Sequence, residues 1–267
     1  MYQKMFDTVG QAGQILLAAR HIEDSVQVKT LACDLVTEYD KKVQDFLCRE
    51  LLAAYPDAGI YAEEEDLCDI EGKSRYFIID PIDGTANFVR GLHHSCISVG
   101  LYAEGRMEAA VVYNPYAEEF FTAVHGQGAY LNGKRLQMSQ VDAANSLVLF
   151  GSAIYYRQTV PATLRFVEEL LPRCLDFRRG GSAALDLCYV AAGKGDLFFE
   201  CCLRPWDYAA GSLIVTEAGG KVSALDGSPL RFYDRCSVAA GNRTNHAELI
   251  ALSQRIGKEP DMKGRIL

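Results

Sequence analysis

The sequence has no long apolar run. Its longest apolar stretches, such as residues 15–19 and 147–150, fall far short of the roughly 20 residues that a membrane-spanning helix needs. The N-terminal residues also lack a long apolar region followed by a small-residue cleavage site, which is the pattern of a secretory signal. We therefore expect no transmembrane helix, no membrane partner and a cytoplasmic location.

Paired cysteine motifs are missing too. The nine cysteines are an odd number without Cys-x-x-Cys spacing, and the adjacent Cys201 and Cys202 are too close for an ordinary disulfide or a zinc site. No cysteine lies in a Cys-x₅-Arg loop of the kind that cradles phosphate. We expect reduced thiols, with Cys174 and Cys188 as packing residues rather than nucleophiles.

Positive charge is in short supply. The chain has 27 basic residues against 35 acidic ones, so its net charge is -8. This charge disfavours nucleic-acid binding, and the sequence has no basic stripe or aromatic-basic RNA platform that would override it. An acidic protein can still bind a phosphorylated small molecule when divalent cations supply positive charge locally.

The first half of the chain alternates helical and strand patterns. Apolar residues at three- and four-residue intervals predict a helix over residues 1–26, and Thr37 with Asp40 resembles a capping box before a second helix that ends at Tyr55. Short β-branched and aromatic segments predict strands. These lie around 59–60 and at 76–79, 95–101, 109–113 and 119–124. Asn132-Gly133 predicts a tight hairpin turn.

The second half repeats the alternation without a linker. We expect one strand near 147–151, a short strand that ends at residue 178 and a third strand over 196–200. We also expect helices over 158–171, over 182–190 and from Asp207 to Gly219. The simplest organisation is one mixed α/β unit over 1–267, with an N-terminal α+β half of about 1–140 and a C-terminal α/β half of about 141–267.

The most informative motif is Asp80-Pro81-Ile82-Asp83-Gly84-Thr85, which ends an apolar strand. Gly84 permits a sharp turn, so both aspartates can face one pocket at the strand's C-terminal end. Mg²⁺ prefers carboxylate and carbonyl oxygens, which makes Asp80, the Ile82 carbonyl and Asp83 plausible ligands. The N–H groups of Gly84 and Thr85, opening a helix, could hold phosphate oxygens.

Each acidic segment also has an ordinary structural explanation. Asp-Pro and Asp-Gly pairs mark turns, and the acidic run at residues 61–66 suits a solvated loop. Asp207 suits a helix N-cap and Glu200 an ordinary strand end. Aspartates directly behind Phe77-Ile78-Ile79 are harder to explain this way, because aspartate is rarely buried without a partner.

Taken together, these segments resemble the inositol monophosphatase family of lithium-sensitive, magnesium-dependent phosphatases. The resemblance rests on Ala62-Glu63-Glu64, on Asp80 to Thr85 and on Trp206-Asp207-Tyr208-Ala209-Ala210-Gly211, in that order and spacing. It extends over nearly the whole chain, including residues 29–40 and 180–184. The implied fold is an inositol monophosphatase/fructose bisphosphatase-like α/β (α+β) layered sandwich of alternating helices and mixed β-sheets.

The resemblance also implies residue roles. The implied metal ligands, for two or three Mg²⁺ ions, are Glu63, Asp80, the Ile82 carbonyl, Asp83 and Asp207. The implied substrate contacts are Asp83, Gly84, Thr85, Ala183, Glu200 and Asp207. Glu63, Thr85 and Asp40 match positions around the attacking water, although Asp40 fits a plain capping box equally well.

The implied reaction is hydrolysis of a small phosphate monoester by metal-activated water, without a phospho-enzyme. Inositol 1-phosphate is the favoured substrate, while fructose 1,6-bisphosphate and nucleotide or dinucleotide phosphates remain alternatives with the same metal site. Arg204 stands where some family members carry histidine, which leaves selectivity open on that side. Family members are commonly homodimers, and some bacterial relatives contact the transcription machinery, so an interaction protein is the non-enzymatic alternative.

Overall fold

The structure is a computed structural model that describes residues 2–29, 31, 35–64, 67–152, 154–260, 262 and 264–266. Parts of two segments named above, residues 30 and 32–34 of the 29–40 stretch and residues 65 and 66 of the acidic run, lie outside the described residues. Within the described residues, no helix is both long enough and apolar enough to cross a membrane.

The N-terminal segment forms two helices, α1 (Gln3–Leu17) and α2 (Glu38–Ala54). Between them lie a short 3₁₀ helix (Ile22–Ser25) and the strands β1 (Gln27–Val28) and β2 (Leu35–Val36). The predicted capping box of α2 is confirmed, because Tyr39 N–H donates to Thr37 Oγ1 at 3.1 Å and Thr37 N–H donates to Asp40 Oδ2 at 2.7 Å.

An eight-stranded mixed sheet follows, in the order β10-β9-β8-β7-β6-β5-β3-β4. Its strands are β3 (Gly59–Ala62), β4 (Cys68–Asp69), β5 (Arg75–Asp83), β6 (Cys96–Ala103), β7 (Arg106–Asn114), β8 (Glu119–Val124), β9 (Gly128–Leu131) and β10 (Lys134–Arg135). Among the described residues of this sheet, only β3 and β5 pair in parallel. Asn132 and Gly133 both adopt positive φ between β9 and β10, which confirms the predicted hairpin turn.

The C-terminal part builds a second, five-stranded mixed sheet in the order β12-β11-β13-β15-β14. Its strands are β11 (Leu147–Phe150), β12 (Asp176–Arg178), β13 (Leu197–Leu203), β14 (Lys221–Ser223) and β15 (Cys236–Gly241). Its helices are α4 (Val160–Leu170), α5 (Ala183–Ala191), α6 (Pro205–Glu217) and α7 (Arg243–Ile256). Short 3₁₀ helices cover Ala143–Asn145, Arg157–Thr159 and Leu171–Arg173.

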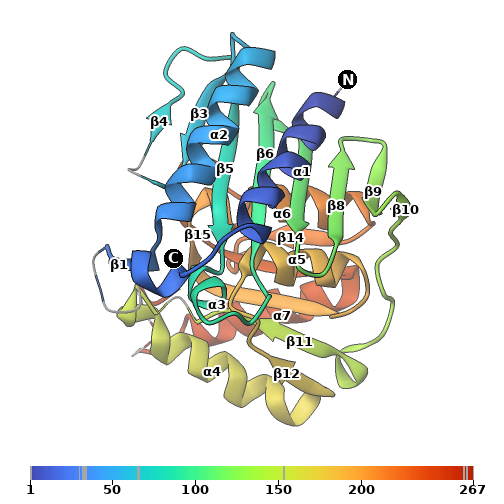
Figure 1. The fold of residues 1–267 in the computed structure, drawn as a ribbon. Helices are drawn as coiled ribbons and strands as arrows, with labels where there is room; N and C mark the ends of the chain where they lie inside the picture. The colour runs from blue at the N-terminus through green and yellow to red at the C-terminus, as the bar shows by residue number, and fades with distance from the viewer. Residues whose placement is uncertain are drawn as a thin grey trace.

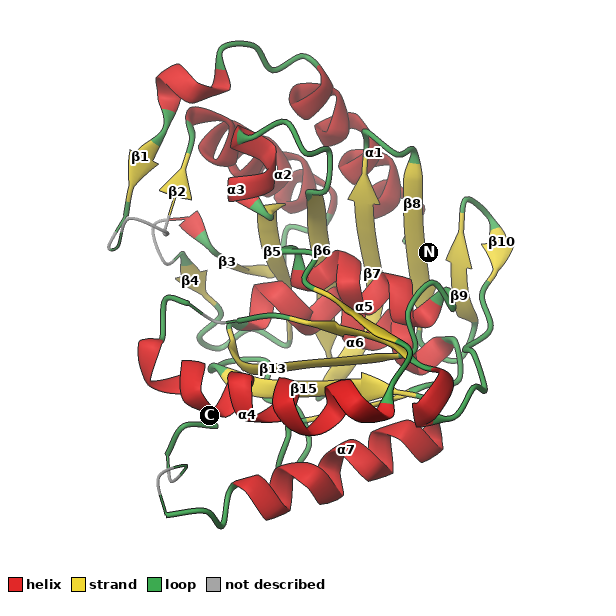
Figure 2. Ribbon diagram, turned by 90° about the horizontal axis from the view of Figure 1, so that it is seen from below, coloured by secondary structure: helices red, strands yellow, loops and turns green. Residues whose placement is uncertain are grey.

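Helices and sheets alternate in layers, as Figures 1 and 2 show. Helices α1 and α2 cover one face of the large sheet, α5 and α6 fill the space between the two sheets, and α4 and α7 cover the outer face of the small sheet. Strand β5 serves two of these cores by alternation: Ile78 faces the central layer and Phe77 faces α1 and α2. The predicted layered sandwich is confirmed.

The two central helices pack unusually closely. A Cβ on Gly211 of α6 would lie 2.7 Å from Leu187 Cβ of α5, so only glycine allows this approach. Helix α6 is buried over most of its length, and its sequence is accordingly apolar on nearly every side.

Two predicted helix boundaries were wrong. Helix α1 ends at Leu17 rather than near residue 26. There the Arg20 guanidinium caps the helix by donating hydrogen bonds to the Leu17 and Ala19 carbonyls at 3.1 and 2.6 Å. Helix α6 begins at Pro205, two residues before Asp207, because proline at the first helical position needs no hydrogen-bond acceptor.

Candidate active site

Strand β5, an inner strand of the large sheet, carries the central carboxylates at its C-terminal end. Its pairing with β6 shifts register between Asp80 and Asp83, so the strand bends at Pro81 and Ile82. Ile82 N–H donates to Asp80 Oδ1 at 3.0 Å, which fixes that carboxylate in the bend. Gly84 follows with φ +89°, and a Cβ there would lie 3.0 Å from the His94 carbonyl oxygen. The turn therefore requires glycine.

Asp207 reaches the same place from helix α6. It is the third residue of the helix rather than its N-cap, and its Oδ2 accepts a hydrogen bond from Arg204 N–H at 2.7 Å. The ordinary explanation of Asp207 as an N-cap is thus wrong, because Asp207 accepts the N-cap N–H from inside the first turn and the N-cap itself is Arg204.

The three aspartates Asp80, Asp83 and Asp207 lie close enough to perturb one another strongly. Burial, followed by the negative charges of Glu63 and Asp83, raises the pKa of Asp80 well above its usual range. Burial and the charges of Asp83 and Glu63 do the same to Asp207. For Asp83, burial outweighs the hydrogen bonds from Ser182 and Ala184 and raises the pKa to about 6.

Glu63 approaches this cluster from the end of β3 and shares a hydrogen bond with Asp80. The turn beyond it is fixed by Gln44, whose Nε2 donates to the Glu64 carbonyl while its Oε1 accepts from Glu64 N–H, both at 2.9 Å. Lys29 Nζ donates to Glu63 at 2.9 Å and to Glu64 at 2.6 Å. Burial lowers the pKa of Lys29, but these two negative charges outweigh it and hold the amine protonated.

Asp40 and Thr85 lie together beside Glu63. Thr85 Oγ1 is 3.2 Å from Asp40 Oδ1 and 3.1 Å from the Ile82 carbonyl oxygen, so one hydroxyl links α2 to the turn after β5. Burial raises the pKa of Asp40 to about 6, with hydrogen bonds from Thr37 opposing it and the Glu63 charge adding to it. The two readings of Asp40 are compatible, because one oxygen caps the helix and the other faces Thr85.

The remaining predicted residues line one side of the cluster. Ser182 Oγ and Ala184 N–H each donate to Asp83 Oδ2 at 2.7 Å, which places the start of α5, including Ala183, against the aspartate. Glu200 of β13 is buried, and its negative charge contributes to the raised pKa of Asp207. The Glu200 carboxylate packs directly on Gly151, where a Cβ would collide with it.

This donor set suits a hard divalent cation. Asp80 and Asp83 are buried and Asp207 is half-buried, yet among the ion pairs of the described residues none includes any of the three. Buried carboxylates without cationic partners are costly unless they are protonated or hold a metal. Within the described part of the chain, no three acidic, histidine or cysteine groups form a ready-made metal-ligand set, so side chains would have to adjust around an ion.

Some neighbours of the cluster were not predicted as site residues. The sequence gives no signal that Lys29 pairs with Glu63, since 34 residues separate them. Cys96 is fully buried with its sulfur 4.0 Å from Asp83 Oδ2 and 3.6 Å from Ser182 Oγ. Burial raises its pKa well above the usual range, so it is a neutral thiol, as expected for reduced packing cysteines.

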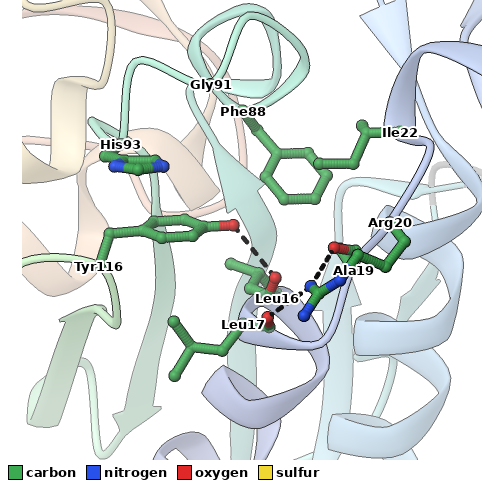
Figure 3. Close-up of a pocket in the computed structure, with 9 residues that line it drawn as sticks. All are labelled: Leu16, Leu17, Ala19, Arg20, Ile22, Phe88, Gly91, His93 and Tyr116. Atoms are coloured by element: carbon green, nitrogen blue, oxygen red, sulfur yellow. Dashed lines mark hydrogen bonds between the residues drawn. The ribbon is translucent and has the colours of Figure 1, made fainter.

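Two cavities of the structure lie outside this cluster. One, of about 300 Å³, lies between the end of α1 and the segment after α3 (Thr85–Val89), and Figure 3 shows it. There the Tyr116 hydroxyl donates to the Leu16 carbonyl at 3.1 Å, and the Tyr116 ring stacks on His93. The other, of about 420 Å³, lies beside β11, β12 and α5. None of the predicted site residues lines either cavity.

Solved and curated proteins resemble this chain over most of its length. The profile of the inositol monophosphatase family matches residues 1–258. Nus factor SuhB from Escherichia coli (strain K12) is 41% identical over 234 residues, which cover 87% of each chain. Extragenic suppressor protein SuhB from Bartonella henselae has a crystal structure with a TM-score of 0.85 and 33% identity, covering 95% of this chain and 98% of that one.

Inositol monophosphatase II from Staphylococcus aureus MSSA476 gives a TM-score of 0.83 at 29% identity, covering 99% of this chain and 98% of the other. Structures titled SaIMPase-II contain inositol monophosphate in one case and 2′AMP in another. These matches agree with the resemblance drawn from the acidic motifs. The chain therefore belongs to the inositol monophosphatase family, and this membership supports a phosphatase activity.

Proposed function

We propose that this protein is a Mg²⁺-dependent phosphatase that hydrolyses a small phosphate monoester, with inositol 1-phosphate as the preferred substrate. The observation that carries the proposal is the cluster of two buried aspartates, Asp80 and Asp83, with the half-buried Asp207, none of which forms an ion pair among the described residues. Magnesium is the cation whose preference for oxygen ligands this set matches.

The proposed holders of magnesium are Glu63, Asp80, the Ile82 carbonyl, Asp83 and Asp207. When bound, magnesium supplies the positive charge that the phosphate dianion and the departing alkoxide need. The chain's own groups perform the remaining tasks. Glu63 and Thr85 orient the attacking water, and Asp40, hydrogen-bonded to Thr85, fixes the hydroxyl that does so.

The substrate is held by the opposite wall of the site. Gly84 and Thr85 present backbone N–H groups at the start of α3, which suit phosphate oxygens. Near Ala183 and Glu200, a backbone N–H and a carboxylate can hydrogen-bond the hydroxyls of a polyol. The inositol monophosphate seen in SaIMPase-II supports this substrate class, and the 2′AMP in the same protein keeps nucleotide phosphates as the alternative.

Phosphate release from inositol 1-phosphate, fructose 1,6-bisphosphate, a dinucleotide phosphate and adenosine 3′,5′-bisphosphate, with Mg²⁺ and with EDTA, tests the proposal. We expect metal-dependent release that is fastest with inositol 1-phosphate and is lost in Asp207→Asn. Faster release from another ester would keep the site and change the substrate, while no release from any ester would overturn the proposed activity.

A second candidate function follows from the names of the relatives. Several proteins at 38–41% identity are called Nus factor SuhB. We infer that a role as an interaction protein contacting the transcription machinery is the alternative to catalysis, or a second activity beside it. Binding to purified RNA polymerase that persists in a catalytically inactive Asp207→Asn variant would support it.

The proposed phosphatase is a single catalytic unit over residues 1–267 that forms a homodimer in the cytoplasm.

A further inference from the structure

The cavity of about 300 Å³ at the end of α1 is built from segments that are far apart in the sequence. Leu16, Leu17 and Ile22 line it from the N-terminal segment, Phe88 from α3 and Tyr116 from the turn after β7. Figure 3 shows these side chains around one space. The volume lies at the lower end of the range of small-molecule sites, so the cavity suits a compact ligand.

The polar groups around this cavity have partners within the protein. The Tyr116 hydroxyl donates to the Leu16 carbonyl at 3.1 Å, and the Arg20 guanidinium donates to the Leu17 and Ala19 carbonyls (Figure 3). Among the described residues, no buried side-chain atom without a hydrogen-bond partner belongs to the lining. A charged ligand would lose its hydration here without an equivalent gain, so the cavity favours an uncharged one.

One wall of the cavity favours a flat ring. The Tyr116 ring stacks on the His93 ring, with the two centroids 4.7 Å apart and an angle of 7° between the ring planes. The Phe88 ring lines the same cavity. Aromatic rings bind other rings through stacked or edge-to-face contacts, which add to the gain from apolar burial. An aromatic ligand therefore gains contacts that an aliphatic ligand of the same size lacks.

The cavity wall is connected to Asp40 and Thr85 of the candidate active site. Phe88 lies three residues after Thr85 in α3, and its ring packs edge-to-face on the ring of Tyr39 at 5.9 Å. The Tyr39 hydroxyl accepts from Arg20 N–H at 3.1 Å and donates to the Arg20 carbonyl at 2.9 Å. Tyr39 is the neighbour of Asp40, which is hydrogen-bonded to Thr85 at 3.2 Å. A shift of Phe88 or Arg20 therefore acts on both ends of this hydrogen bond.

We propose that this cavity is an effector site, which binds a small uncharged aromatic molecule against Tyr116 and Phe88. None of the proposed metal ligands or substrate contacts lines it. A bound molecule favours one arrangement of Phe88 and of the end of α1, and so changes how often Asp40 and Thr85 are aligned for the attacking water. The binding stands without the proposed phosphatase activity, whereas the effect on turnover rests on it.

Calorimetric titration of the full-length protein with indole tests the binding. We expect one saturable site and a roughly fivefold or greater loss of affinity in Leu17→Ser, which makes an apolar wall polar. Leu164→Ser is the matched control, because Leu164 is an exposed leucine of α4 outside the cavity. Ile22→Phe is expected to abolish binding by filling the cavity. Indole-3-carboxylate, which adds a charge to the same ring, is expected to bind more weakly than indole.

Phosphate release from inositol 1-phosphate, with and without saturating indole, tests the effect on the active site. We expect kcat to change roughly twofold or more in the wild type and to stay unchanged in Ile22→Phe. Leu17→Met guards against misfolding, because it keeps an apolar wall and is expected to retain most of the affinity for indole.

Several results would overturn the proposal. No saturable indole binding, equal losses in Leu17→Ser and Leu164→Ser, or tighter binding of indole-3-carboxylate would refute the binding site. Saturable binding that leaves phosphate release unchanged would refute the effector role. A wild type that binds indole but releases no phosphate under any condition would refute the phosphatase activity and the effector role together, and would confirm the binding site.

Discussion

Replacement of Asp83 by asparagine is expected to stabilise the metal-free protein while removing its metal site. Asp83 is buried, and its pKa rises from 3.8 to about 6 in the folded state. One pKa unit is worth about 1.4 kcal/mol, so ionised Asp83 costs the folded state about 3 kcal/mol at pH 8. Asparagine preserves the shape and one acceptor oxygen for Ser182 and Ala184, but it carries no charge.

The pH dependence has a definite sign. Below about pH 3 Asp83 is protonated in both states and contributes no difference. Between pH 4 and about pH 6 the unfolded chain releases its proton while the folded chain keeps it, so the free energy of unfolding falls as pH rises. Above about pH 6 Asp83 causes no further decrease in the free energy of unfolding. The Asp83→Asn variant has no ionisable group at this position, so the decrease does not occur in it.

Urea unfolding in EDTA at pH 4, 5, 6 and 8, for the wild type and Asp83→Asn, measures the effect. Between pH 4 and pH 8 the free energy of unfolding of the variant is expected to rise relative to that of the wild type by about 2 kcal/mol, since part of the effect is already present at pH 4. Excess Mg²⁺ is expected to stabilise the wild type alone, by mass action. Asp226→Asn is the control, since a hydrogen bond from Ser228 lowers the pKa of this more exposed aspartate. A difference independent of pH would refute the reasoning.

Three further substitutions test the fold around the site. Phe199→Ala removes a fully buried ring that stacks on Phe150, and urea unfolding should show a loss of about 3–5 kcal/mol. Gly84→Ala forces a Cβ against the His94 carbonyl at positive φ, which should cost about 1–2 kcal/mol in thermal unfolding and slow phosphate release. Thr37→Val removes the N-cap of α2 and should cost about 1 kcal/mol in urea unfolding, while an unchanged midpoint would argue against the cap.

Local signals in the sequence predicted the parts of the site that depend on neighbouring residues. An apolar run followed by Asp80-Pro81-Ile82-Asp83-Gly84 encodes a strand, a bend and a turn within a few residues, and the structure has all three. The capping box at Thr37 and the hairpin at Asn132 are equally local. The family assignment was also confirmed, since it rests on short acidic motifs in a fixed order.

Features that depend on distant residues could not be predicted in the same way. The pairing of Lys29 with Glu63 and the clamp of Gln44 on Glu64 arise from tertiary packing, which no local pattern encodes. The cavity at the end of α1 likewise joins residues from separate elements. The local patterns predict no element over residues 221–256, which form β14, β15 and α7. Helix α6 begins two residues before the predicted start at Asp207, because Pro205 occupies its first position.

The hydrogen bond from Ala184 N–H to Asp83 Oδ2 joins two layers of the molecule through a single exchangeable proton. Asp83 belongs to the large sheet and Ala184 to a helix of the central layer, so this amide is shielded only while the two layers are in register. Its deuterium uptake therefore measures how often the layers separate. A brief separation of the layers that leaves both sheets folded would still disassemble the carboxylate cluster. Deuterium uptake at the Ala184 amide would detect such a separation.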